Sequence, residues 1–322
     1  MGPAKSKPGE TDHQEAQAAR LMRLATLASV LTACLLIIVK LFAYLSTGAV
    51  SILASLMDSL MDSVASLINF FAVRYALTPA DNNHRFGHGK AESLAALIQA
   101  AFIVATSAFL IHEALHRLFE PVPMPAVTAG VAVMLLAMVA TSLLVMFQVY
   151  VVRRTGSTAI HADSVHYRAD LLSNAATLLA LLLASQGVIQ ADPVFALLIA
   201  LYLLISTREI LRQALNELLD RELPEHQRQQ ISAIALANAS VKGLHDLRTR
   251  QSGRTAIIQL HLEMDSDISL IEAHHISDEV EVAILEQFPG ADIVIHQDPI
   301  GVIEVQRWQT DNPSMTNPQK YN

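Results

Sequence analysis

Four ionisable side chains with a repeated spacing lie inside long apolar runs of the chain. Asp58 and Asp62 are four residues apart, and so are His166 and Asp170. In a helix, residues at i and i+4 share one face about one turn apart. Two such faces brought together would offer three carboxylates and one imidazole, which is the ligand set of a tetrahedral zinc site.

Ionisable residues within a membrane span are costly, so they indicate function. The alternative is a set of capping or hydrogen-bonded acids. The apolar flanks of Asp58 and Asp62, and the double occurrence of the spacing, favour a metal site. His161 and Asp163 precede His166 by one to two turns and could line an access path or lie in the interfacial zone.

Two further groups of residues could bind metal. Asp81, His84 and His88 lie in a polar stretch, where metal ligands and ordinary solvated side chains are about equally expected. Near the C-terminus, His296 and Asp298 are two residues apart and project from one face of an expected strand. His261 is expected on a polar strand face, and His245, His274 and His275 are further histidines of this part.

The run from His112 to His116 matches H-E-x-x-H, the helix motif of zinc proteases. It falls at the end of an apolar run, directly before Arg117, and no third-ligand motif is evident. We therefore interpret it as a coincidence of sequence.

The chain has 322 residues, of which 52% are hydrophobic and only 16% are charged. A membrane helix needs about 20 mostly apolar residues. Six stretches qualify when acids and a histidine are allowed in the second and fifth: 24–45, 49–77, 91–118, 126–150, 161–187 and 190–212. The first stretch is longer than the apolar part of a signal peptide, so it is expected to remain as an anchor.

Lysine and arginine gather at alternating ends of these stretches, which predicts that both termini are cytoplasmic. We expect a multi-pass protein of the cell inner membrane. The net charge of −8 argues against a nucleic-acid partner. The single cysteine, Cys34, cannot form an intrachain disulfide.

After Asp220 the pattern changes to that of a soluble domain with the order α-β-β-α-β. The expected fold class is an all-α six-helix transmembrane domain plus a small α+β cytoplasmic domain. The expected divisions are a disordered tail at 1–19, the membrane domain at 20–213, the cytoplasmic metal-binding and dimerisation domain at 214–304, and a disordered tail at 305–322.

From Arg20 to Pro299 the chain resembles the cation diffusion facilitator family, and closely its YiiP/FieF-type zinc and iron efflux transporters. The stretches that carry the resemblance are 51–62, 79–92, 166–170 and 244–250. It implies a homodimer and three kinds of metal site. The transport site would comprise Asp58, Asp62, His166 and Asp170, the loop site Asp81, His84 and His88, and a two-metal cytoplasmic site His245, His261, His274, His296 and Asp298. Lys90 and Asp220 match a salt bridge of the family at the junction of membrane and cytoplasm.

These observations together predict a proton-coupled antiporter that exports a divalent metal by alternating access, and not an enzyme. Metal and protons compete for the same ligands, and histidine ordinarily titrates at a pKa of about 6.5. His166 favours Zn²⁺ as the bound metal, with cadmium, ferrous iron and manganese also compatible. The alternatives are an intramembrane protease using His112, Glu113 and His116, and a metal sensor that does not transport.

Overall fold

The computed structural model describes residues 8–48, 50–119, 130–186 and 190–301. The tail expected at 305–322 lies outside these residues. The chain divides into two compact units, each treated separately below. One comprises Met1–Arg221 with Gln251–Thr255, and the other comprises Glu222–Arg250 with Ala256–Asn322.

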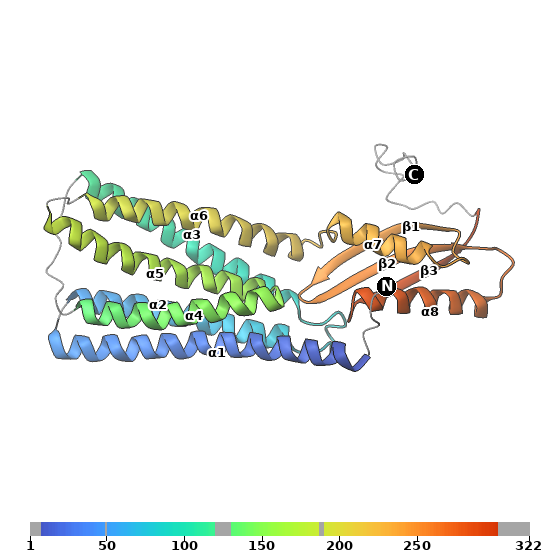
Figure 1. The fold of residues 1–322 in the computed structure, drawn as a ribbon, viewed down its shortest axis with the longest axis horizontal. Helices are drawn as coiled ribbons and strands as arrows, with labels where there is room; N and C mark the ends of the chain where they lie inside the picture. The colour runs from blue at the N-terminus through green and yellow to red at the C-terminus, as the bar shows by residue number, and fades with distance from the viewer. Residues whose placement is uncertain (1–7, 49, 120–129, 187–189, 302–322) are drawn as a thin grey trace, which may run out of the picture. The chain divides into compact units, whose positions relative to one another are not determined.

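The first unit contains six helices among its described residues, running side by side (Figure 1). They are α1 (Pro8–Thr47), α2 (Val50–Ala76), α3 (Lys90–Phe119), α4 (Gly130–Thr155), α5 (Thr158–Ser185) and α6 (Ala191–Leu218). All of these except α5 contain a stretch long and apolar enough to cross a membrane. The exception has a chemical reason, since α5 carries His161, Asp163, His166, Arg168 and Asp170.

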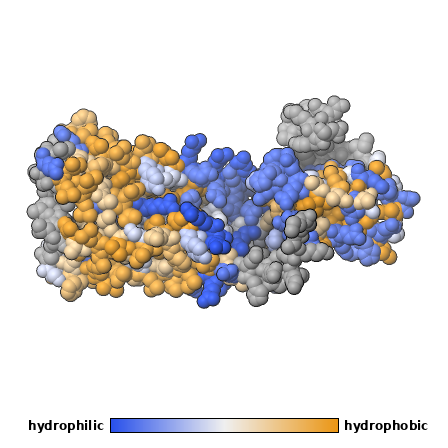
Figure 2. All heavy atoms as spheres, viewed as in Figure 1, coloured by the Kyte–Doolittle hydropathy of each residue, from blue (hydrophilic) through white to orange (hydrophobic). Residues whose placement is uncertain are grey.

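Large apolar side chains point away from this bundle and cover its visible face (Figure 2). Phe42, Phe71, Leu143 and Ile205 are among those more than half exposed. In water such a surface would be strongly unfavourable, whereas lipid tails solvate it. The exposed surface therefore fits the membrane location predicted from the sequence.

The interior of the bundle is built from small side chains. Between α3, α5 and α6 the buried residues include Ala96, Ala100, Ala162 and Ala214, with Leu203 filling the space beside them. Small residues let membrane helices approach closely, because lipid offers little hydrophobic drive for packing. Helices α1 and α2 also pack side by side.

Helix α1 begins earlier than expected. The sequence predicted a disordered tail over 1–19, but the chain is helical from Pro8 onward. Proline is tolerated in the first turn of a helix, and the glutamate, glutamine and alanine residues that follow have high helix propensity. The prediction of a disordered tail is therefore wrong for residues 8–19, and residues 1–7 lie outside the part of the chain that the structure describes.

A buried polar network fixes α5 among its neighbours, and Asp163 is its centre. The Asp163 carboxylate is 1% exposed and accepts hydrogen bonds from Ser29 of α1 at 2.7 Å, Gln148 of α4 at 2.7 Å and Gln99 of α3 at 3.3 Å. One turn further along α5, the Tyr167 hydroxyl lies 2.8 Å from Ser66 of α2. Asp163 therefore joins α5 to α1, α3 and α4 in the interior of the bundle.

The second unit is a three-stranded sheet with two helices. Its elements are α7 (Glu225–Leu236), β1 (Gly243–Ser252), β2 (Thr255–Met264), α8 (Leu270–Gln287) and β3 (Asp292–Pro299). This order confirms the predicted α-β-β-α-β pattern. The helix α8 starts at the N-cap Ser269, whose hydroxyl accepts a hydrogen bond from the Glu272 amide at 3.2 Å.

The sheet has one apolar and one polar face. In β2, Ile258, Leu260 and Leu262 are buried against residues of α7 and α8 such as Ile231 and Ile284. The alternate positions, including His261, point to the other face. Strands β2 and β3 pair in parallel with His261 opposite His296 and Glu263 opposite Asp298. The register thus gathers ionisable side chains on the face away from the helices.

We predict that Asp163→Ala lowers the free energy of unfolding by about 3 kcal/mol, because several buried donors lose their acceptor. Samples of the detergent-solubilised protein are heated to a series of temperatures and applied to a size-exclusion column. The measurement is the temperature at which half of the protein no longer elutes in the monodisperse peak. Thr177→Ala is the matched control, since the Thr177 hydroxyl donates its hydrogen bond to the Ser173 carbonyl within α5. Equal midpoints for the two variants would contradict a central structural role of Asp163.

Candidate metal centres

Helices α2 and α5 bring three of the four predicted intramembrane ligands together. One ligand atom from each of Asp62, His166 and Asp170 lies within 4.8 Å of the others. His166 Nε2 is 3.0 Å from Asp62 Oδ1 and 3.8 Å from Asp170 Oδ2. Two carboxylates flank one imidazole nitrogen, so a cation placed between them would find both oxygen and nitrogen ligands.

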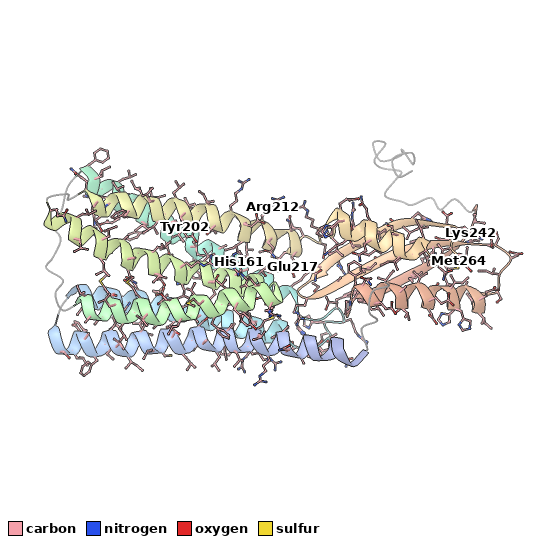
Figure 3. The ribbon with its side chains drawn as sticks, in the orientation of Figure 1. His161, Tyr202, Arg212, Glu217, Lys242 and Met264 are labelled. Atoms are coloured by element: carbon pink, nitrogen blue, oxygen red, sulfur yellow. The ribbon has the colours of Figure 1, made fainter. Side chains whose placement is uncertain are left out.

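Asp58 stands apart from this group. It lies one turn before Asp62 on α2, as predicted, and it interacts electrostatically with Asp62. Its side chain is nevertheless exposed, and its carboxylate is not within the ligand distance of the group. A small rotation of α2 or a different side-chain rotamer would be needed to add it as a fourth ligand. His161, labelled on α5 in Figure 3, is likewise not a member of the group.

Lys40 is a functional candidate that the sequence reasoning missed. It lies in α1, and its ammonium donates hydrogen bonds to the Ser55 carbonyl at 3.0 Å and the Ser59 hydroxyl at 2.6 Å, both on α2. The same ammonium interacts electrostatically with Asp62, Asp170 and Asp58. The rule that flags an ionisable residue inside a membrane span would have found it, because its flanks are apolar.

The loop between α2 and α3 forms a second group, which contains Asp81, His84 and His88 as predicted. Asp81 Oδ1 is 3.4 Å from His84 Nδ1, and Asp81 Oδ2 is 3.4 Å from His88 Nε2. His88 is buried, and its ring packs against Tyr75 of α2 with centroids 4.5 Å apart. The loop therefore keeps its three candidate ligands close together, and the contact of His88 with Tyr75 anchors the loop on α2.

The backbone of this loop prepares Asp81 for a cation. Its Oδ1 accepts hydrogen bonds from the amides of His84 at 2.6 Å and Asn83 at 2.8 Å. These backbone hydrogen bonds, with smaller contributions from the charges of His84 and His88, lower the pKa of the Asp81 carboxyl. Asp81 consequently stays ionised at any pH at which a histidine could bind metal.

The polar face of the sheet carries the third group. His245 of β1, His261 of β2 and Asp298 of β3 place ligand atoms within 4.8 Å of one another. Asp298 Oδ2 is 2.8 Å from His261 Nδ1 and 3.3 Å from His245 Nε2, while Asp298 Oδ1 is 3.1 Å from His296 Nε2. The buried Asp298 thus bridges all three histidines, and each of its oxygens has a different set of partners.

His274 is not part of this group. It lies on α8, which packs on the opposite, apolar face of the sheet, and its Nε2 is 3.6 Å from Asp278. Glu263, in contrast, joins the margin of the group, with Oε1 3.1 Å from His245 Nδ1. The alternation of β2 could have indicated Glu263, because it shares a face with His261.

Two other sequence expectations have clear outcomes. Lys90 Nζ lies 2.8 Å from Asp220 Oδ1, which confirms the predicted salt bridge within the chain. In the H-E-x-x-H run, Glu113 pairs with Arg117 at 2.7 Å. A glutamate held by arginine is poorly placed to act as a general base, and the described residues of this run form no metal group with others.

Comparisons with known proteins identify the family of both units of the chain. Residues 26–219 match the family described as cation efflux transmembrane domain, and residues 223–300 match the cation efflux protein, cytoplasmic domain. Cation-efflux pump FieF of Cronobacter sakazakii is 51% identical over 284 residues, which cover 88% of this chain and 95% of the relative. The pump of the same name from Escherichia fergusonii is 50% identical over the same shares.

A solved structure shows a partial similarity. The metal-bound C-terminal domain of the CzcD transporter from Thermotoga maritima is 25% identical, with a TM-score of 0.24. It covers 24% of this chain and 93% of that one.

We predict that His261→Ala lowers the zinc affinity of the sheet-face group by about 100-fold, because one of three clustered ligands is lost. Calorimetric titration of the full-length protein with zinc should then show one fewer tight binding phase. His226→Ala, an exposed histidine of α7 outside the group, is the matched control. An unchanged titration of His261→Ala would place the tight cytoplasmic site elsewhere.

Proposed function

Because the chain belongs to the cation diffusion facilitator family and is of its YiiP/FieF type, we propose that it exports zinc from the cytoplasm in exchange for protons. The relatives are named as cation-efflux pumps, so the chain is a transporter of divalent metal and not an enzyme. The choice of zinc and the coupling to protons are the proposed parts.

The observation that supports the proposal most is the group of Asp62, His166 and Asp170 between α2 and α5. Its imidazole favours zinc over manganese, which prefers oxygen ligands alone. Asp58 completes the set in the metal-bound state, after its carboxylate turns toward Asp62. Cadmium and ferrous iron would fit the same four ligands and are the competing substrates.

Release of the metal follows from the division of the ligands between two helices. A closed zinc site with four protein ligands holds its ion tightly, which is unsuitable for a carrier. Asp58 and Asp62 belong to α2, whereas His166 and Asp170 belong to α5. A tilt of one helix against the other separates the two pairs and weakens the site, as alternating access requires.

Protons drive the cycle by competing for the ligands. Zinc binds to ionised carboxylates and a neutral imidazole, so binding from the cytoplasm releases protons. When the site opens outward, protons return to the same groups and displace the metal. The inward proton gradient therefore moves metal outward.

The remaining parts of the chain have roles in the same transport function. Helix α5 is the sixth membrane span, since its polar residues face the bundle and the metal, and both termini are cytoplasmic in a cell inner membrane. The membrane domain at 20–213 transports, and the domain at 214–304 binds metal and dimerises. His274 of a second copy would join the sheet-face ligands, because it cannot reach them within one chain.

We predict that Asp62→Ala lowers zinc flux by more than about 100-fold, because it removes a ligand of the transport site. The measurement is zinc uptake into proteoliposomes with an imposed pH gradient. Ser63→Ala is the control and should leave flux unchanged, since the Ser63 hydroxyl donates its hydrogen bond to the Leu60 carbonyl of its own helix.

Three results would overturn this assignment. Flux that survives Asp62→Ala would move the transport site elsewhere. Zinc binding without flux of zinc, cadmium or ferrous iron in the wild type would favour a metal sensor instead. Proteolytic activity lost in Glu113→Gln but kept in Asp62→Ala would favour the protease alternative.

The proton coupling makes a separate prediction. Collapsing the pH gradient with a protonophore should reduce uphill zinc transport to the level of passive leak. Downhill zinc movement should persist, because the carrier can still exchange protons and metal along the metal gradient. Uphill accumulation that continues after the gradient is collapsed would exclude antiport with protons.

A further inference from the structure

The ammonium of Lys40 is partly buried between α1 and α2, in an apolar stretch where charge is costly. It lies in the apolar stretch of α1, and its direct hydrogen-bond acceptors, the Ser55 carbonyl and the Ser59 hydroxyl, are both neutral. A cation in hydrocarbon needs either water or an opposite charge nearby. Neutral acceptors alone do not meet that need, whereas the nearby carboxylates would.

Those carboxylates are the ones at the metal group. Ser55, Ser59 and Asp62 follow one another on the same face of α2, at spacings of four and three residues. Lys40 therefore reaches across from α1 to the face of α2 that ends at Asp62. Its ammonium interacts electrostatically with Asp62, Asp170 and Asp58. It forms no direct ion pair with them among the described contacts, and so it leaves their oxygens available.

Charge balance suggests what this arrangement does. Three ionised carboxylates, one ammonium and one divalent cation together carry no net charge. Without Lys40 the same metal-loaded group would keep a net negative charge in a low-dielectric environment, where each unit charge is expensive. With Lys40, the occupied site is neutral only for a cation of charge two.

We propose that Lys40 is a positioned counter-charge that sets the affinity and charge preference of the intramembrane metal site. This role of Lys40 rests on the proposed function, because it concerns the same metal site. Lys40 is not a ligand. It repels the metal enough to permit release, and it reduces the repulsion among Asp58, Asp62 and Asp170 when the metal is gone. Among the described contacts, the other ionisable group that faces these carboxylates is the imidazole of His166 on α5.

The test separates the effect of the Lys40 charge from the effect of its hydrogen bonds to α2. Lys40→Gln keeps a donor for Ser55 and Ser59 but removes the charge, whereas Ser59→Ala removes one acceptor and keeps the charge. Zinc uptake into proteoliposomes is measured as a function of zinc concentration for each variant. For Lys40→Gln we expect the KM for zinc to fall on the order of tenfold and the maximal rate to fall with it, because release slows. For Ser59→Ala we expect a KM close to that of the wild type.

A merely structural role would give a different pattern, since a loosened α1–α2 contact raises KM or leaves it unchanged. A KM for Lys40→Gln that is unchanged or raised would overturn the proposal, and so would a KM for Lys40→Arg that falls as far as that of Lys40→Gln. If Lys40→Gln does not purify as a folded protein, Ser59→Asp cancels the charge while retaining the lysine. An unchanged KM in Ser59→Asp would overturn the proposal equally.

The result for the Lys40 variants can be distinguished from the result of the Asp62→Ala test of the proposed function. Loss of flux in Asp62→Ala establishes the transport site whatever Lys40 does. If wild-type protein carries no metal at all, the proposed function fails before the Lys40 variants are compared.

Discussion

The contact between Asp62 of α2 and His166 of α5 is the constraint on which the membrane unit depends. It joins two charged or chargeable groups in a region whose surroundings are hydrocarbon, at a distance of 3.0 Å. Such groups are tolerated there only if they face each other and away from lipid. In this conformation the contact turns the polar faces of α2 and α5 toward each other, and the apolar residues on their remaining faces are left for packing and for lipid.

Much of the rest of the bundle supports that contact. Asp163 holds α5 to α1, α3 and α4 through hydrogen bonds to Ser29, Gln99 and Gln148. Tyr167, the residue after His166, is fully buried and meets Ser66 of α2. Side chains of this kind orient a site without touching its ligand, in the way that outer hydrogen bonds orient metal-binding histidines. Small residues such as Ala96 and Ala162 allow the helices that carry them to come close enough.

The sequence predicted the parts of the structure that follow from local spacing. The pairs at i and i+4, the loop Asp81–His84–His88 and the order of strands and helices after Asp220 all depend on residues near each other in the chain. The position of Asp58 outside the group could not be predicted, because it depends on how far α2 is rotated relative to α5. The roles of Lys40 and Asp163 likewise depend on neighbours from other helices. His274 was grouped with the sheet histidines by resemblance, but α8 lies on the opposite face of β2.

The ligands on the sheet face come from three separate strands, His245 from the first, His261 from the second and Asp298 from the last. A bound ion would therefore act as a cross-link between the two ends of this domain, and its binding free energy would add to the folding free energy. The domain would open less often in a metal-rich cytosol than in a metal-poor one, and proteases act on opened domains. The lifetime of the protein in the cell would then rise with the supply of the ion that the proposed pump removes.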